Sequence, residues 1–396
     1  MNLTQVLSEI SSKGIKLSAE GDELKIRAPK GALTPEIRDL LSKNKLELLQ
    51  LLQQKNNSVS ATSVPLEAVP RDKDLPVSYQ QERLWTVEQL MSDRVSLNLC
   101  QALRITGLID IEILQKSWNE IISRYEVLRT NFAFIEGSLV QVVAPSLTAK
   151  ISVLDYLDLS KTEQERVIQE IFEEESAQSF DLSQGPLFST KLLRFSEQEG
   201  VLVSVFHHII SDGLSVNFLV HEHILLYDSY INNKQSPLKE LDIQYGDYAV
   251  WQREWLKGDV LEKGLDYWKK QLTDVSTLYP VPPDTFQVSS GFEGIKKNFV
   301  IPDNILPTVQ KVSNQYNVTP VVIFLSVFYV LILQYSLKDD IIVGLPVSGR
   351  VHHKLESAIG FFTETILLRG KIDDNLTFKE LLNKVKEITV EAYANV

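Results

Sequence analysis

The chain has 396 residues, of which 44% are hydrophobic and 23% charged, with a formal net charge of −12 and a single cysteine, Cys100. This length exceeds one typical domain and indicates two or three units, and the acidic balance argues against nucleic acid as a partner, because phosphate binding needs clustered Lys and Arg. One cysteine cannot build an internal disulfide framework, so we expect the chain in the cytoplasm.

Residues 1–54 form a self-contained pattern, which begins without the basic and continuous apolar segments of a signal peptide. Apolar residues at helical spacing predict a first helix, and two alternating runs around residues 20–22 predict a β-hairpin. Thr34 and Pro35 are typical of a helix start, and leucines between residues 46 and 52 line a last helix. The expected order of elements is αββαα.

The second strand of this hairpin has one basic face. Lys25 and Arg27 alternate with the apolar residues 24, 26 and 28, and side chains alternate between the two faces of a strand. We therefore expect Lys25 and Arg27 to face solvent, with Lys30 just beyond them.

Residues 55–74 lose this periodicity and gain Ser, Asn and Pro, which is typical of an inter-domain linker. Beyond them, strand-like runs alternate with amphipathic helices, a pattern that predicts an α/β architecture. We divide it into a first lobe, 75–255, and a second lobe, 256–396. Strands are expected in ALRITGLI, LVQVVA, STKLLRF and VLVSVF of the first lobe and in NFVIP and DIIVGLPV of the second, and helices at 109–125, 161–178, 213–231, 304–316 and 377–394.

The most apolar run, residues 321–333, has 13 residues, whereas a helix needs about 20 to span a bilayer. It is interpreted as a buried core helix, and no membrane association is expected.

The most informative segment is VLVSVFHHIISDGLS, residues 201–215. A buried strand ends in His207 and His208, and adjacent residues of an extended backbone point to opposite sides. One imidazole can therefore enter a cleft while the other packs inside. Asp212 and Gly213 open the next helix, on which His221 and His223 are expected to lie on a solvated face. No Cys or carboxylate cluster with ligand spacing accompanies any histidine, so no metal is expected.

The spacing HHxxxDG resembles that of the chloramphenicol acetyltransferase and condensation domain superfamily. Four further segments match other motifs of this family, in family order: SYQQERLW (78–85), YEVLRTNF (125–132), YGDYAVWQ (245–252) and IGFFTETILLR (359–369). Residues 1–54 resemble the TubC-type N-terminal docking domain, above all in KGIKLSAEGDELKIRAPKGALTPEIRDLL.

Two positions depart from the family motifs. Tyr125 stands where the family usually has His, and Glu364 stands where it usually has Asn. An acid at 364 would change the polarity of the substrate tunnel if it faces inward. Glu126 and Arg129 of the second motif are expected to form structural pairs.

The resemblance implies a small αββαα docking domain followed by a two-lobed chloramphenicol acetyltransferase-like condensation domain. Its lobes would form a V with a tunnel between them, and the second lobe is expected to be incomplete because the chain stops at Val396. The implied source is the start of a nonribosomal peptide synthetase module, in which two carrier-bound acyl groups are joined by an amide bond.

For the site, the resemblance implies that His208 accepts a proton from the acceptor amine, or else positions the amine or donates a hydrogen bond to the oxyanion. Asp212 is expected to pair with Arg350 and hold the loop, with His207 packed inside. Gly213 would allow close approach of the thioester or its arm, and Ser215 is a weaker candidate for a polar contact there.

Partner carrier proteins for donor and acceptor would supply the 4′-phosphopantetheine arms, and no cofactor is expected on this chain. Downstream adenylation and carrier domains are implied too. The docking domain would capture an acidic C-terminal tail of an upstream subunit through Lys25, Arg27 and Lys30, because opposite charges speed encounter and reject basic competitors. Two other functions stay open: a noncatalytic condensation-like scaffold that only positions carriers, and a stand-alone acyltransferase that uses acyl-CoA.

Overall fold

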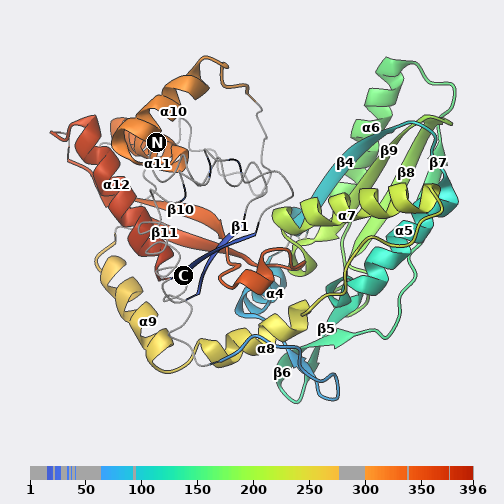
Figure 1. The fold of residues 1–396 in the computed structure, drawn as a ribbon, viewed down its shortest axis with the longest axis horizontal. Helices are drawn as coiled ribbons and strands as arrows, with labels where there is room; N and C mark the ends of the chain where they lie inside the picture. The colour runs from blue at the N-terminus through green and yellow to red at the C-terminus, as the bar shows by residue number, and fades with distance from the viewer. Residues whose placement is uncertain are drawn as a thin grey trace. The chain divides into compact units, whose positions relative to one another are not determined.

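The computed structural model describes residues 16–20, 23–27, 34, 37, 41, 64–91, 95–275, 299–336, 339–373 and 375–395. The chain divides into two compact units (Figure 1). Residues 64–258 and 348–364 form one unit, which we call the His-loop unit. Residues 1–63, 259–347 and 365–396 form the other, which we call the second unit.

The His-loop unit is built on a four-stranded sheet in the order β4-β9-β8-β7. Strands β4 (Asn98–Thr106) and β8 (Phe188–Ser196) each pair antiparallel with β9 (Glu199–His207), and β7 (Ser152–Asp155) pairs parallel with β8. The central strand β9 is almost entirely buried. This burial explains the continuous apolar run VLVSVF, because a strand covered on both faces needs no polar alternation.

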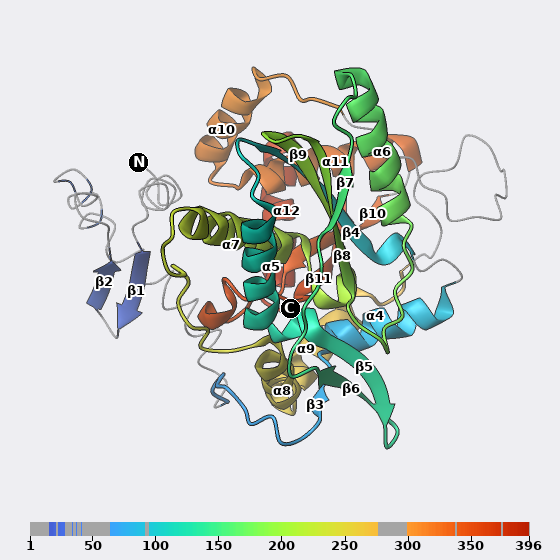
Figure 2. The same cartoon turned by 90° about the vertical axis from the view of Figure 1, so that its right-hand side faces the viewer.

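Helices cover both faces of this sheet. Leu192, Leu202 and Phe206 belong to one hydrophobic cluster with residues of α5 (Ile111–Arg124) and α7 (Gly213–Ile231). The alternate residues Leu193 and Val203 form another cluster, against α6 (Lys161–Ser176). Figures 1 and 2 show α7 and α5 side by side, with α6 apart from them at the other face.

A smaller sheet, β3-β6-β5, completes the unit. Its strands are β3 (Leu75–Pro76), β5 (Thr130–Ile135) and β6 (Ser138–Val143). The helices α4 (Tyr79–Leu90) and α8 (Tyr245–Trp255) lie beside it. The unit also has short 3-10 turns, η1 (Val95–Leu97), η2 (Glu126–Arg129) and η4 (His353–Leu355). Between β5 and β6 both turn residues, Glu136 and Gly137, have positive φ, as a two-residue hairpin turn of this hand requires.

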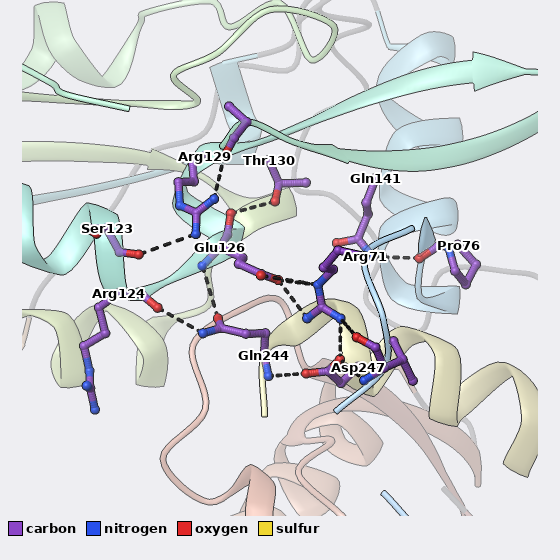
Figure 3. Close-up of polar contacts among 12 residues, drawn as sticks. Arg71, Pro76, Ser123, Arg124, Glu126, Arg129, Thr130, Gln141, Gln244 and Asp247 are labelled. Atoms are coloured by element: carbon purple, nitrogen blue, oxygen red, sulfur yellow. Dashed lines mark hydrogen bonds and ion pairs between the residues drawn. The ribbon is translucent and has the colours of Figure 1, made fainter. Parts of the chain in front are cut away.

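A polar network fastens residues 69–71 to this part of the unit (Figure 3). Arg71 pairs with Glu126 at 2.8 Å and with Asp247 at 2.7 Å, and Asp247 also accepts hydrogen bonds from the backbone N–H of Val69 and of Gln244. Glu126 therefore has a structural partner, as expected, and that partner lies 55 residues away in the chain.

Arg129, the second charged residue of the motif, does not pair with Glu126. It donates hydrogen bonds to the carbonyl oxygens of Ala144 and Ser123 (Figure 3). Part of the expected linker also packs on this unit, because the Trp251 indole donates to the carbonyl of Val64.

The second unit holds the helices α9 (Asp259–Gln271), α10 (Ile305–Tyr316), α11 (Pro320–Ser336) and α12 (Phe378–Tyr393). It also holds most of the paired strands β10 (Asp340–Ser348) and β11 (Thr363–Lys371), of which residues 348, 363 and 364 belong to the His-loop unit. The apolar run lies in α11, and only one face of this helix is buried in the core. Ile323, Tyr329 and Ile332 are buried, whereas Phe324 and Val327 are 46% and 52% exposed.

One strand expected in this unit is absent from its described residues. Phe299 and Val300, in the run NFVIP, are 84% and 90% exposed and lie outside any strand. The prediction of a strand there was wrong, because apolar character alone does not make a strand without a neighbouring strand to pair with.

The docking segment contains the expected hairpin. Strands β1 (Lys16–Glu20) and β2 (Glu23–Arg27) pair antiparallel with Glu20 opposite Glu23. Lys25 is exposed, as predicted, whereas the side chain of Arg27 and all of Lys30 lie outside the described residues. The flanking helices also lie largely outside them.

Within the described residues, no single helix is long and apolar enough to cross a membrane, and α10 and α11 meet that criterion only as a pair, bent by 101° at the break between them.

Candidate active site

The loop that follows β9 carries the histidine pair. His207 ends the strand, His208 begins the 3-10 turn η3 (His208–Ile210), and α7 starts at Gly213. Asp212 is the N-cap of α7, and its carboxylate accepts the backbone N–H of Ser215 at 2.7 Å. A carboxylate is a favoured N-cap because it satisfies an N–H group that has no partner within the helix.

His208 is held with one ring nitrogen open for chemistry. Its Nδ1 lies 2.9 Å from the carbonyl oxygen of Ser211. A carbonyl oxygen can only accept, so Nδ1 carries the hydrogen and the neutral ring keeps its lone pair on Nε2. The half-buried ring packs edge-on against Phe361, with 4.8 Å between centroids. The side chain therefore presents a proton acceptor in a defined orientation.

His207 has the opposite arrangement. It is 1% exposed, and its Nδ1 accepts the backbone N–H of Ile209 at 3.1 Å. Burial, assisted by repulsion from His208, lowers the pKa of His207 to about 4, so the ring is neutral near pH 7. Its Nε2 lies 3.5 Å from the Glu88 carboxylate. The two adjacent imidazoles thus play different parts, as the alternation of strand residues indicates.

Asp212 forms a buried bidentate ion pair with Arg350. The two guanidinium nitrogens lie 3.0 and 3.1 Å from the carboxylate oxygens, which also accept the N–H of Phe362 at 3.1 Å. Burial alone would raise the pKa of Asp212, but the Arg350 charge and the hydrogen bonds outweigh it and hold that pKa below its usual value. Arg350 lies in the same compact unit as Asp212, although the sequence places it in the second lobe.

Ser215 belongs to this same network. Its fully buried hydroxyl donates to the carbonyl of Gly360 at 2.8 Å and accepts from Arg350 at 2.7 Å and from the Gly360 N–H at 3.1 Å. These three partners use its one donor and two acceptor positions, so Ser215 has a structural part in this network. Its contact with substrate stays a prediction.

Gly213 is exposed at the start of α7, and a Cβ placed on it would meet no other atom within 4 Å. The space above this backbone is open on the protein side. A ligand can therefore come close to the backbone at the first residue of the helix.

Glu364 is partly buried and pairs with Arg83 of α4 at 3.3 Å. Burial raises the pKa of this carboxyl, and Arg83 opposes that rise. The acid that replaces the usual Asn thus has a cationic partner within the His-loop unit.

Some contacts were not foreseen. Phe361, Glu88 and the Ser211 carbonyl touch the histidine pair, and no spacing rule links them to it, since their elements are distant in sequence or contribute only backbone.

His221 is exposed as expected, but His223 is buried, donates to the Leu114 carbonyl, and packs beside Trp118. The prediction of a solvated face for His223 was wrong because α7 is covered by α5 on that side.

Two further features bear on ligands. The described residues contain no group of three or more His, Cys, Asp or Glu able to hold a metal. A cavity of about 340 Å³ lies between β4, β9 and α7, but none of residues 207–213 lines it.

The mixed α/β fold and the HHxxxDG loop define a domain of the chloramphenicol acetyltransferase-like class. Solved structures agree: the EpoB cyclization-docking bidomain of a nonribosomal peptide synthetase from Sorangium cellulosum superposes with a TM-score of 0.70 at 21% identity, over 99% of this chain and 77% of that one. A condensation domain of the enacyloxin polyketide synthase gives 0.68 at 24% identity, over 100% and 76%. At these identities the likeness establishes the fold.

Sequence comparison is more specific. Residues 71–396 match the condensation domain family and residues 3–54 match the TubC N-terminal docking domain. The chain belongs to the condensation domain family and carries a TubC-type docking domain before it, which confirms the resemblance and the fold class.

The relatives are peptide synthetases. A linear gramicidin synthase of Brevibacillus parabrevis is 38% identical over 86% of this chain, and gramicidin S synthase 2 of Aneurinibacillus migulanus is 33% identical over 81%. The chain spans only 6% and 7% of the length of these two relatives.

Proposed function

We propose that this chain forms an amide bond between a donor acyl or peptidyl thioester and the α-amine of an acceptor aminoacyl thioester, each carried on a phosphopantetheine arm of a partner carrier protein. The observation that carries the proposal is the orientation of His208. Its Nδ1–H is engaged by the Ser211 carbonyl, so Nε2 is the atom available to the reactants.

The reaction needs one proton acceptor and space for the thioester. The acceptor nitrogen attacks the donor carbonyl carbon, a C–N bond forms, and the C–S bond breaks to release the donor arm as a thiol. Nε2 of His208 can take the amine proton and return it to the sulfur, because a neutral imidazole with its lone pair on Nε2 can act as a general base and then as a general acid. The open space at Gly213 is where the donor thioester would lie.

A second role for His208 remains compatible with the same geometry. A neutral imidazole whose Nε2 accepts a hydrogen bond from the amine positions that amine for attack, without removing its proton in the slow step. A hydrogen bond to the oxyanion has less support, because Nε2 carries no hydrogen in the neutral tautomer that the contact with the Ser211 carbonyl requires.

We also propose that residues 1–54 bind the acidic C-terminal tail of an upstream subunit, which would act in the cytoplasm. The hairpin β1–β2 supports this proposal, because an extended peptide can add to a short sheet edge through main-chain hydrogen bonds. Exposed Lys25 on β2 supplies charge of the sign that such a tail requires.

The decisive experiment compares two substrate pairs with wild type and His208→Ala. Amide formation from two loaded carrier proteins, lost in the variant at unchanged melting temperature, supports the proposal. Turnover of acyl-CoA with a free amine instead would point to a stand-alone acyltransferase. Binding of both carriers without turnover in wild type would point to a noncatalytic scaffold.

A further inference from the structure

Glu88 is a buried carboxylate that lies beside a histidine. It lies in the last turn of α4 and is 1% exposed, and ionisable groups are rarely buried to this degree unless they are paired. Its Oε2 lies 3.5 Å from Nε2 of His207, which is also 1% exposed; this polar contact is at the outer limit of hydrogen-bond distance and does not meet hydrogen-bond geometry in the structure. Neither residue takes part in the reaction derived above.

The position of the hydrogen on His207 determines which atom of this contact is the donor. Nδ1 accepts the N–H of Ile209, so the hydrogen of the neutral ring must be on Nε2, the atom that faces Glu88. A ring flip would bring carbon atoms to both places and lose the contact with Glu88 and the contact with Ile209 together. Glu88 therefore favours one of the two orientations of this ring.

The backbone of Ile209 is held at its N–H and at its carbonyl by residues that α4 provides or orients. Its N–H is bound by His207, and its carbonyl accepts the Gln81 amide at 3.2 Å. The peptide group that carries this N–H joins His208 to Ile209 in the turn η3. A shift of the peptide would turn the His208 ring relative to the Ser211 carbonyl, and with it the direction of the Nε2 lone pair.

We propose that Glu88 is a positioning residue, which acts through His207 and the Ile209 peptide to fix the orientation of His208. The role rests on the proposed function of His208, but the geometry that it predicts can be measured without turnover. The feature required of residue 88 is a hydrogen-bond acceptor at the reach of a Glu side chain, not a negative charge.

The test uses the 396-residue chain with Glu88→Gln, Glu88→Leu and Glu88→Asp. Gln keeps an acceptor at the same reach, Leu keeps the approximate volume without an acceptor, and Asp keeps the charge but is one methylene shorter. We expect kcat for amide formation to fall about 10–100-fold in the Leu and Asp variants with KM for both carriers unchanged, since small misplacements of a reacting group have effects of this size. The Gln variant should stay within about threefold of wild type by the same reasoning.

A matched control is Glu175→Gln. Glu175 is another buried helical carboxylate, 5% exposed, which pairs with Lys191 at 2.8 Å, and its loss should leave kcat unchanged. Melting temperatures of all variants show whether a fall in kcat merely follows loss of folded protein. A fall in kcat that tracks the melting temperature, in Glu88 and Glu175 variants alike, would reduce Glu88 to a structural residue and overturn the proposal.

Selective ¹⁵N-histidine labelling supplies the second readout. Wild type should show His208 with hydrogen on Nδ1 and His207 with hydrogen on Nε2, and Glu88→Leu should broaden or average the His208 pattern. An unchanged His208 pattern in that variant, or a Gln variant as impaired as the Leu variant, overturns the proposal. Should His208→Ala turn over normally, the proposed function fails, while the labelling experiment still decides whether Glu88 orients the ring.

Discussion

Replacing Asp212 with Ala tests whether the buried ion pair holds the site loop together. Asp212 and Arg350 are only 1% and 4% exposed. Removing one partner of a buried pair leaves an uncompensated charge, which costs about 3–5 kcal/mol, and losing the N-cap of α7 costs about 1 kcal/mol more. We therefore expect the free energy of unfolding to fall by about 4–6 kcal/mol, the sum of these two contributions.

Urea denaturation followed by tryptophan fluorescence measures this change, because four of the five tryptophans lie in the His-loop unit. The double variant Asp212→Ala, Arg350→Ala should lose less than the sum of the single changes, with a coupling of about 2–3 kcal/mol. A single variant within about 1 kcal/mol of wild type, or strict additivity in the cycle, would refute this reasoning, given the size of effects at buried pairs. Normal stability with lost activity would make Asp212 catalytic.

The same pair predicts a pH dependence. The pKa of Asp212 is lower in the folded chain than in the unfolded one, where it is about 3.9. The unfolded state therefore binds more protons as the pH falls, so the contribution of the pair is complete above about pH 4 and is lost below it. The stability difference between wild type and Asp212→Ala should accordingly be constant from about pH 7 to 5 and shrink at lower pH.

Three other substitutions give contrasting results. Gly213→Ala should melt like wild type, because the added Cβ meets no atom within 4 Å, but should lower amide formation; unchanged turnover would exclude close approach of substrate. Gly360→Ala should lower the free energy of unfolding by about 3 kcal/mol or more, since φ is +153° and the Cβ would overlap the Tyr245 ring; a normal urea midpoint would contradict this. Lys25→Glu should leave the melting temperature unchanged and weaken binding of an acidic peptide, most at low salt, and equal affinity at low and high salt would remove the electrostatic account.

Most of the helices and strands could be predicted from local patterns in the sequence. The run 201–206 and the helix after Gly213 were predictable because burial of a strand on both faces and an Asp N-cap each leave a direct mark in the residues concerned. The prediction of a strand in the run NFVIP was wrong because its apolar character is a local property, whereas a strand depends on a pairing neighbour elsewhere in the chain. The prediction for His223 was wrong because the residues of a helix face do not show whether water or another helix, here α5, covers that face.

The site was predictable only as far as it is built from one segment. His207, His208, Asp212 and Gly213 stand together in the sequence, and resemblance to a family added Arg350. Glu88 was not foreseen, because it lies 119 positions before His207 by their residue numbers, on a helix whose composition gives no reason to bury an acid. The structural partners of Ser215, Arg350 and Gly360, could not be predicted either, because they lie 135 and 145 positions away in the chain.

The adjacent histidines have opposite hydrogen positions, and this difference has an electrostatic consequence. His207 keeps its hydrogen on Nε2 and stays neutral because burial lowers its pKa to about 4, whereas His208 keeps its hydrogen on Nδ1. A charged His207 would repel a proton arriving at its neighbour. Because burial keeps His207 uncharged near neutral pH, a proton that His208 accepts in the proposed reaction would meet no like charge on its neighbour.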